Sequence, residues 1–420
     1  MMTQAFYSGL SGLKTSGFAI DALSDNIANI STVGYRGYGV EFSSLFEENL
    51  STQTSLSSVD STIGIGVNVQ NSPMDLNYGT LALADQSTDL ALYGDGWFGI
   101  QGNDQTMYTR AGNFTFDVNN DLVTQDGFHV LGTMGNNISD NNTLTSVLSE
   151  VPLGNVKAQE SLRFPNTLTY PAEPTTDVKF LANIGVEDLS QTVGAGIVDP
   201  DGVRNHLRLE FNKSAVQVPP GTQWDVIATT QSLDGTIIYD TKTGTANFDE
   251  QGGLSSTTLS TIDNNGVTIT MDLGSGYDGI VSTSTPATSG SSISNGTIAG
   301  ELAGYAISKD AEVIATFTNG LQSSVGKVAV YHFQNDQGLL REAGARFSES
   351  NNSGEPIFFQ DADGNNILGT NITNYQLENS NVKLEVALTE LIILQRTYDS
   401  NSRTITTADE MMKKALDMDA

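Results

Sequence analysis

The most informative stretch of this sequence is residues 381–420, NVKLEVALTELIILQRTYDSNSRTITTADEMMKKALDMDA. It contains no glycine and no proline, and one line of residues recurs at alternating intervals of four and three. That line consists of Leu384, Leu388, Leu391, Gln395, Tyr398, Ser402, Ile405, Asp409, Met412 and Leu416. Residues at this spacing lie on one face of an α-helix, and the alternation is the pattern of a coiled-coil seam. A helix of about 60 Å with an exposed apolar stripe needs a partner.

A second line of the same kind lies within residues 4–30. It consists of Phe6, Leu10, Leu13, Gly17, Ile20, Ser24 and Ile27. The glycines in this segment each weaken a helix by about 0.5–1 kcal/mol relative to alanine, but they also allow a second helix to approach closely. One interpretation is that this helix packs on a globular domain of its own. The interpretation that we favour pairs the two ends as an antiparallel coiled coil, with the rest of the chain inserted between them.

Composition excludes several classes of function. The 19 basic and 49 acidic residues give a formal charge of −30, and no Lys/Arg cluster occurs, so binding to nucleic acid or anionic lipid is not expected. The absence of cysteine excludes a disulfide framework and a zinc–thiolate site. The three histidines, His129, His206 and His332, are isolated in the sequence and are interpreted as ordinary packed or surface residues.

We expect neither a cleavable secretory signal nor a membrane-spanning helix. The N-terminal residues lack a basic region followed by an apolar core and a small-residue cleavage site, so we expect no cleavable secretory signal. No run of 18 apolar residues occurs, so we expect no membrane span. The many Gly, Ser, Thr and Asn residues form a turn-rich β composition, which is common in exported, assembling surface proteins.

The interior of the chain predicts β structure, because apolar and polar residues alternate between turn signals. Residues 73–133 have the pattern of a compact β unit with short strands, including residues 90–93 and 97–101. Between about residues 150 and 318 the alternation continues, with strands expected at 207–211, 236–239 and 267–271. The sequence therefore predicts a mainly β protein with α-helical termini.

The segment between the first helix and the β structure is less regular. Phe42, Leu45 and Phe46 are expected to form a short apolar turn, and the Ser/Thr-rich residues 51–61 are interpreted as a linker. Val67 and Val69 alternate with polar residues and begin strand character.

Three motifs that could carry chemistry have better structural explanations. Residues 94–99 (GDGWFG) match a dinucleotide-binding pattern, but a strand follows where that mechanism requires a helix, so we interpret them as a β-turn. Asp117, Asn119 and Asp121 have calcium-loop spacing without the required glycine and glutamate, and the loop at Asp361 is similarly incomplete. We interpret both as Asx turns and predict no catalytic, cofactor or metal site, which argues against an enzyme.

Both ends carry long motifs. At the N-terminal end, residues 9–13 (GLSGL) are followed by residues 24–35 (SDNIANISTVGY); at the C-terminal end, residues 377–382 (LENSNV) are followed by residues 395–398 (QRTY). The residues that we single out in these motifs are Asn26, Asn29, Gly34, Gln395, Arg396 and Asn401. These motifs resemble those of the flagellar rod/hook axial protein family. Residues 94–98 (GDGWF) and 110–114 (RAGNF) are similar to the first β domain of that family.

The resemblance implies an architecture. The terminal helices, residues 1–35 with 381–420, would pair and line the inside of a tube, and residues 36–72 would be a linker. The inner β domain would comprise residues 73–150 and 319–380, and the outer β domain residues 151–318. Assembly would bury a seam made of Leu10, Leu13, Ile20, Ile27, Leu384, Leu388, Leu391, Tyr398, Ile405, Met412 and Leu416.

The resemblance also implies a function. Residues 300–302, 318–320, 338–339 and 353–356 are similar to hook members of the family, and the large inserted β domain agrees with this. The expected function is a subunit of a tubular homopolymer that transmits torque in the flagellum, exported unfolded by the flagellar type III apparatus. The expected partners are further copies of the chain and the hook cap, distal rod and hook–filament junction proteins. A distal rod protein is one alternative, and a secreted β-rich adhesin, which would leave the matched termini unexplained, is another.

We predict that limited proteolysis of the free chain removes the first 30 and the last 40 residues before it cuts the β domains. An unpaired amphipathic helix is only marginally stable in water, so both ends are expected to be disordered before assembly. Mass spectrometry of the resistant fragment checks this. Ends that resist the protease as strongly as the β core contradict the prediction.

Overall fold

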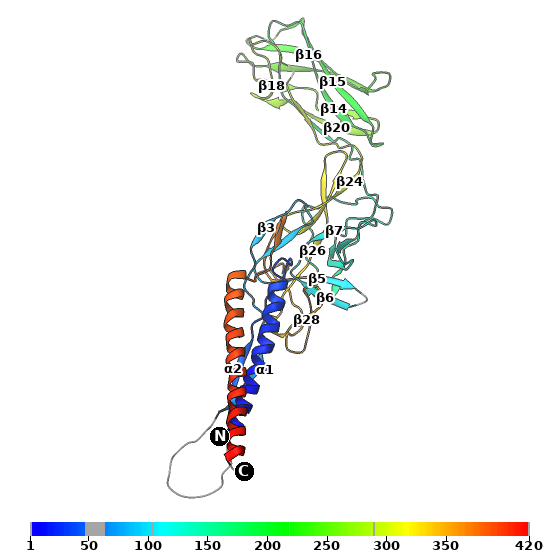
Figure 1. Cartoon of the computed structure of the whole chain (residues 1–420). Coiled ribbons are helices and arrows are strands. Elements are labelled where there is room, and N and C mark those ends of the chain that lie inside the picture. The colour runs from blue at the N-terminus through cyan, green and yellow to red at the C-terminus, as the bar shows by residue number, and fades with distance from the viewer. Residues whose placement is uncertain (1, 47–63, 103–104, 218, 289, 419–420) are drawn as a thin grey trace.

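The two ends of the chain form long helices that lie side by side. The computed structural model describes residues 2–46, 64–102, 105–217, 219–288 and 290–418. Its two α-helices are α1 (Met2–Ala28) and α2 (Leu384–Met418), so the prediction of a helix at each end is confirmed. They run antiparallel, because Gly9 in α1 faces Ile405 in α2, whereas Gly37, beyond the end of α1, lies against Val382, which precedes α2. Figure 1 shows the helix pair at one end of an elongated molecule.

Asparagine and glycine end α1. The Asp25 carbonyl accepts both the Asn29 side-chain Nδ2 at 2.9 Å and the Asn29 backbone N–H at 3.1 Å, so the Asn29 side chain reinforces the last turn. Five residues later Gly34 adopts a positive φ of 67°, a conformation that glycine takes without strain. The chain can therefore turn sharply and leave the helix axis.

A β-ribbon lies along α1 where the sequence led us to expect a turn. Strands β1 (Glu41–Phe46) and β2 (Gly64–Asn71) pair antiparallel, and Phe42 lies opposite Val69. The expected turn at Phe42–Phe46 is wrong, because these residues take strand geometry once they pair with a segment that lies 18 to 27 positions later in the chain. The backbone N–H of Val67 donates to Ser11 Oγ at 3.2 Å and so attaches the ribbon to α1. The predicted linker at 51–61 lies outside the described residues.

The inner β unit is built from two separate parts of the chain. Its strands on the N-terminal side are β3 (Leu81–Leu83), β4 (Leu90–Tyr93), β5 (Trp97–Gly102), β6 (Gln105–Thr109), β7 (Phe114–Phe116), β8 (Leu122–Thr124), β9 (His129–Met134), β10 (Glu160–Ser161) and β11 (Thr169–Tyr170). Its strands on the C-terminal side are β24 (Gly300–Ile307), β25 (Glu312–Phe317), β26 (Gln322–Val328), β27 (Val330–Tyr331), β28 (Leu340–Glu342), β29 (Arg346–Ser348), β30 (Phe359–Gln360), β31 (Asn366–Ile367), β32 (Asn371–Asn374) and β33 (Gln376–Glu378).

The central strands of the main sheet, β26, β9 and β5, are mainly buried. The strand order is β11-β24-β25-β26-β9-β5-β6-β29-β28, so groups of strands from the two chain segments alternate in it. Successive side chains of a strand point to opposite faces, and in β5 Trp97 joins one apolar cluster while Phe98 joins another. Two smaller pairings, β3 with β33 and β4 with β32, bring the chain back toward α2.

The outer β unit is a single insertion between β11 and β24. Its strands are β12 (Asp177–Phe180), β13 (Ala182–Asn183), β14 (Ser190–Val198), β15 (Arg204–Lys213), β16 (Thr222–Ser232), β17 (Ile238–Phe248), β18 (Leu254–Thr257), β19 (Thr261–Asn264), β20 (Val267–Asp272), β21 (Gly274–Ser275), β22 (Asp278–Val281) and β23 (Ser292–Ser294). A five-stranded antiparallel sheet, β14 to β18, encloses a core with a four-stranded sheet of order β19-β20-β12-β23. Trp224, Phe211 and Ile269 are fully buried in this core.

The two β units have separate cores. The core residues of the outer unit all lie between Val178 and Ile280, whereas Phe164, Tyr170 and Val313 belong to the inner core. Two extended segments, one after β11 and one before β24, connect the units. Glu173 in the first forms an isolated β-bridge with Thr297 in the second. We therefore propose that the outer unit spans about residues 171–299, a shorter range than the 151–318 expected from the sequence.

We predict that the two β units unfold independently. The chain contains two tryptophans, one in each core: Trp97 is 3% exposed and Trp224 is fully buried. Leu209→Ala leaves a cavity in the outer core and should lower the free energy of unfolding of that unit by about 2–5 kcal/mol. In a Trp97→Phe background, the urea midpoint that Trp224 fluorescence reports should fall.

The control is the same Leu209→Ala substitution in a Trp224→Phe background. There Trp97 fluorescence should report an unchanged midpoint for the inner unit. A shift of both midpoints by the same amount contradicts the independence of the cores.

Candidate assembly interface

Small residues form the face of α1 that packs against α2. Residues of α1 that are buried in the single chain recur every three or four positions, and they are Gly9, Gly12, Ser16, Ala19, Leu23 and Asn26, with Thr15 beside them. A Cβ added at Gly12 would lie 2.7 Å from the side-chain nitrogen of Asn401, so a larger residue there would displace the Asn401 side chain. The buried line lies one residue before the line of large apolar residues predicted from the sequence.

The predicted seam residues of α1 lie at the edge of this interface. Leu10, Leu13, Ile20 and Ile27 are half-buried in the single chain. Their side chains are therefore partly covered by the chain itself and partly available to another molecule. The regular spacing of small residues in α1 could have revealed the interface. It was missed because a search for apolar residues selects large side chains first.

The predicted seam of α2 divides between two faces. Leu391, Ile405 and Met412 are half-buried on the face that also carries the buried residues Ala387 and Ala408. Leu384 is 45% exposed and Leu388 is 43% exposed, and Tyr398 is exposed at 37%. Leu416 lies in the last turns of the helix. The structure thus brings part of the predicted line to α1 and leaves the rest facing solvent.

The polar residues of the same helix are on or near the surface. Gln395 and Arg396 are exposed, and Ser402 and Asn401 are half-buried. The Asp409 carboxylate is 2.7 Å from the Lys413 ammonium one helical turn later, in an exposed i,i+4 pair of the kind that stabilises helices slightly.

The helix pair presents an uncovered apolar surface. On α2 the exposed large apolar residues are Leu384, Val386, Leu388, Ile392, Ile393, Tyr398 and Met411. On α1 they are Tyr7 and Phe18. At about 3.6 residues per turn, Leu384, Leu388, Ile392 and Tyr398 share one face of α2, whereas Val386, Ile393 and Met411 lie on another. Large apolar side chains left exposed on both faces indicate that the helix pair has surfaces for interaction. We call these nine residues the apolar stripe.

Direct bonds join the two chain segments at the base of the helix pair. The Gly34 N–H donates to the carbonyl of Glu378 at 2.7 Å, and the Gly37 N–H donates to Asn381 Oδ1 at 2.8 Å. The Asn381 N–H donates to the carbonyl of Tyr35. We call residues 34–37 together with residues 378–381 the terminal clamp. It lies between the helix pair and the inner β unit (Figure 1).

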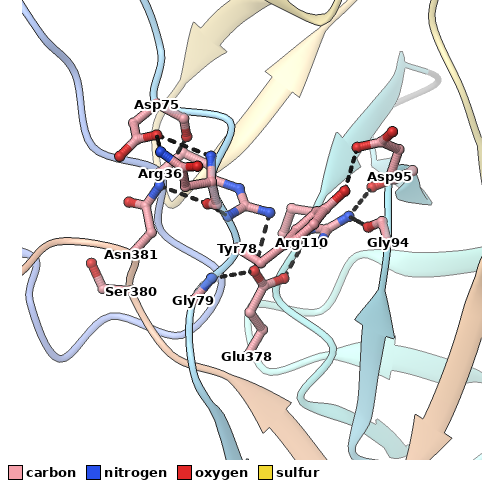
Figure 2. A network of polar contacts seen from close by, with 12 residues as sticks. Arg36, Asp75, Tyr78, Gly79, Gly94, Asp95, Arg110, Glu378, Ser380 and Asn381 are labelled. Carbon is pink, nitrogen blue, oxygen red and sulfur yellow. Dashed lines mark hydrogen bonds and ion pairs between the residues drawn. The ribbon is translucent and has the colours of Figure 1, made fainter.

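A buried ionic network anchors the clamp to the inner β unit (Figure 2). The Glu378 carboxylate lies 3.0 Å from Arg36 Nη2 and 3.0 Å from Arg110 Nε, and none of the three side chains is more than 4% exposed. Arg110 also donates to the carbonyls of Gly94 and Gly96 at 2.8 and 2.6 Å. A carboxylate can be buried only when it is paired and hydrogen-bonded in this way.

A tyrosine ring covers both cations of the network. The ring centre of Tyr78 is 5.6 Å from the guanidinium carbon of Arg36 and 5.6 Å from that of Arg110, within the range of cation–π attraction. The Tyr78 hydroxyl donates to Asp95 at 2.7 Å. Burial and the neighbouring Arg110 lower the pKa of Arg36 from its ordinary value, and the Glu378 carboxylate opposes this.

A second anchor holds the last turn of α1. Arg341 in the β28–β29 hairpin lies 2.8 Å from the Asp25 carboxylate, and its guanidinium covers the rings of Tyr35 and Tyr38 at 5.3 and 4.8 Å. Burial raises the pKa of Tyr35 to about 12, so its hydroxyl is a hydrogen-bond donor at neutral pH. Asn26 bonds both backbone groups of Tyr38, at 2.8 and 2.9 Å.

The remaining motifs have the structural roles expected from the sequence. Asp117 Oδ1 accepts the N–H groups of Asn119 and Asp121 at 2.8 Å each, which is an Asx turn. Asp361 Oδ1 accepts those of Asp363 and Asn365 at 3.0 and 2.8 Å. The 94–99 segment is a turn followed by strand β5, and its glycine carbonyls bind Arg110.

Family models match the three parts of the chain that meet at the clamp. The description "Flagella basal body rod protein" matches residues 6–36, "Flagellar hook protein FlgE/F/G D1 domain" matches residues 91–158, and "Flagellar basal body rod FlgEFG protein C-terminal" matches residues 374–418. The three matched segments are thus similar to rod and hook proteins of the flagellum.

Flagellar hook proteins are similar to this chain over nearly its whole length. The flagellar hook protein FlgE of Escherichia coli (strain K12) is 25% identical over 445 residues, which cover 99% of this chain and 100% of that protein. The FlgE of Borreliella burgdorferi is 24% identical over 448 residues, with 98% and 99% covered. The FlgE of Brucella suis biovar 1 is 27% identical over 420 residues, with 96% of each covered.

A solved structure supports the fold. The crystal structure of the Helicobacter pylori flagellar hook protein FlgE2 matches with a TM-score of 0.51 at 16% identity, covering 71% of this chain and all of that one. The mainly β fold with helical termini is therefore the fold expected from the sequence.

We predict opposite effects for two glycine-to-alanine substitutions near the interface. Gly34 has a positive φ of 67°, and a Cβ there would lie 2.4 Å from the backbone nitrogen of Ala111. Gly34→Ala should therefore weaken the clamp by at least about 1 kcal/mol from the backbone conformation alone. Hydrogen exchange of the amides in residues 34–38 and 376–382 should become faster.

The matched substitution is Gly17→Ala. A Cβ at Gly17 meets no atom within 4 Å, so alanine should stabilise α1 by roughly 0.5–1 kcal/mol and slow exchange within the helix. Equal effects of the two substitutions contradict this assignment of Gly34.

Proposed function

We propose that this chain is the structural subunit of the bacterial flagellar hook, located in the hook and basal body of the flagellum. Copies of the chain would form a tube that acts as a flexible universal joint and transmits torque from rod to filament. The observation that carries the proposal is the apolar stripe, which the single chain leaves uncovered although its own helices are paired. Similarity to hook proteins along almost the full chain supports the same function.

The two ends of the molecule would have different tasks in the tube. The apolar stripes of neighbouring subunits would pack together and hold the inner wall, because burial of apolar surface at about 25 cal/mol per Å² favours association. The outer β units would face solvent. Residues 171–299 carry five basic and fifteen acidic residues, a net charge of 5 − 15 = −10. Polar, like-charged neighbours bind weakly, so they could slide past one another when the tube bends.

The proposed assembly involves further flagellar components. We expect contact with the distal rod proteins at one end, with the hook cap during growth, and with the hook–filament junction proteins at the other end. We expect export of the unfolded chain by the flagellar type III apparatus. Neither helix of the described residues is long and apolar enough to cross a membrane. We propose no catalytic role and no cofactor.

Deletion of the gene and imaging of basal bodies tests this function. Loss of hooks above complete rods, with motility restored by the gene, is the expected result. Rods that end early assign the chain to the distal rod, and electron microscopy of its polymers should then show straight, rigid tubes rather than curved ones. Intact hooks in the deletion strain overturn both assignments.

We predict that Leu388→Asp and Leu391→Asp each block polymerisation and leave the β units folded. Leu388 is 43% exposed in the single chain, so the charge should act only between subunits. Leu391 is half-buried beside α1, so its replacement should also loosen the helix pair. Sedimentation measures polymer, and tryptophan fluorescence checks the fold.

The control for both variants is Val118→Asp. Val118 is 94% exposed in a loop of the inner β unit, and a carboxylate there should leave polymerisation unchanged. Normal tubes formed by either leucine variant contradict the role of the seam.

A further inference from the structure

The terminal clamp joins positions that are far apart in the sequence. Gly37 and Asn381 are 344 positions apart, and their bond of 2.8 Å lies outside both helices. Asn381 Nδ2 also donates to the carbonyls of Asp75 and Asn77 at 2.9 Å each. Arg36 donates to the carbonyl of Asn77 as well. Each chain end is thus bonded both to the other end and to the segment that leads into the inner β unit.

The clamp does not depend on the helices that it holds. Its ionic partner Arg110 belongs to the inner β unit, and the Glu378 carboxylate also accepts the Gly79 N–H at 2.9 Å. Glu378 is the last residue of β33, which pairs with β3 of the same unit. These contacts remain possible when α1 and α2 are unfolded, because all of them are made beyond the helix ends.

A closed clamp raises the effective concentration at which the two helices meet. α1 ends at Ala28 and α2 begins at Leu384, so only a few residues separate each helix from the clamp. Two segments tethered by short linkers meet at an effective concentration in the millimolar range, because their encounter has become intramolecular. Without the clamp the two segments are still joined by the pair β3–β33, but Leu81 in β3 lies 81 − 28 = 53 positions beyond the end of α1, so the encounter must close a longer loop.

We propose that the terminal clamp holds the bases of the two helices together before they pair, so that Arg36, Glu378 and Asn381 are positioning residues for formation of the helix pair. The clamp is then the point from which the two helices zip together toward the chain termini. This inference deepens the proposed function, but it concerns the isolated chain and is tested there.

A pair of cysteines can report how often the helices meet. The chain contains no cysteine, so introduced thiols are unique. A Cβ built at Gly12 lies 2.9 Å from Cγ of Asn401, and the three atoms nearest to it all belong to that side chain. Gly12→Cys with Asn401→Cys therefore removes the atoms that would clash and brings two Cβ atoms near the distance of about 3.5–4.5 Å that a disulfide requires.

The experiment measures the effective concentration of these two thiols in the full chain, from the disulfide equilibrium in buffers of reduced and oxidised glutathione. Arg36→Met removes the ionic link between residues 36 and 378, and Asn381→Ala removes the side-chain bonds to Gly37, Asp75 and Asn77. Each variant should lower the effective concentration at least about tenfold, the change expected for loss of one or two buried charged or backbone-directed hydrogen bonds.

Arg346→Met is the matched control. Arg346 lies in the inner β unit, where its guanidinium pairs with the exposed carboxylate of Asp126 and covers the ring of Phe128, neither of which belongs to the clamp, so the effective concentration should not change. Glu378→Gln leaves two guanidinium groups facing each other without a carboxylate and should lower it most. Trp97 fluorescence confirms that the inner β unit is folded in every variant.

Two results overturn the proposal. One is an effective concentration in Arg36→Met and Asn381→Ala equal to that in Arg346→Met, with native Trp97 emission in all three. The other is a chain with Gly12→Cys and Asn401→Cys and an intact clamp in which the disulfide forms no more readily than between thiols on separate molecules. Failure of the proposed function is distinguishable, because it shows as intact hooks in the deletion strain whatever the thiols report.

Discussion

The Glu378 carboxylate is the group on which the arrangement of the parts depends. It is 1% exposed, and an uncompensated charge at such a position costs several kcal/mol. Compensation comes from Arg36, next to α1, and from Arg110, in the inner β unit, while Glu378 itself lies just before α2. No two of these segments are neighbours in the sequence. All three chain segments must therefore come together for these charges to be buried favourably, which fixes how the segments that lead to α1 and α2 join the inner β unit.

Periodicity made the regular elements predictable, since helices and strands repeat within a few residues. The strand at Leu90–Tyr93 and the helix at Leu384–Met418 follow directly from such patterns. The network could not be predicted, because Arg36, Arg110 and Glu378 are single charges separated by 74 and 268 positions. The strand character predicted at Val67 and Val69 is confirmed by β2, but β1 and its pairing with β2 were missed, because these depend on contacts between distant segments and with α1.

The position of the helix interface was predicted to within one residue, and the error has a physical cause. A seam read from hydrophobicity selects large apolar residues such as Leu10 and Leu13. In the chain, the closest packing is made by Gly9 and Gly12, where the backbones approach. Large side chains are then displaced to the edge and outer faces of the pair. The sequence pattern does not show whether the large apolar residues pack inside the helix pair or face other molecules, because both arrangements give the same spacing.

Small residues between the helices and large apolar residues outside them make a pair that is complete only in an assembly. Each β unit buries its own core, with Phe98 and Trp224 fully enclosed, and needs no other molecule to do so. The helix pair buries mainly glycine, serine and alanine, which contribute little apolar area, and it exposes Ile392 and Ile393 at 59% each. Its stability must then come mostly from neighbouring subunits. A clamp that keeps the two helices together at one end lets such a weak pair form when those neighbours are present, without requiring it to be stable before.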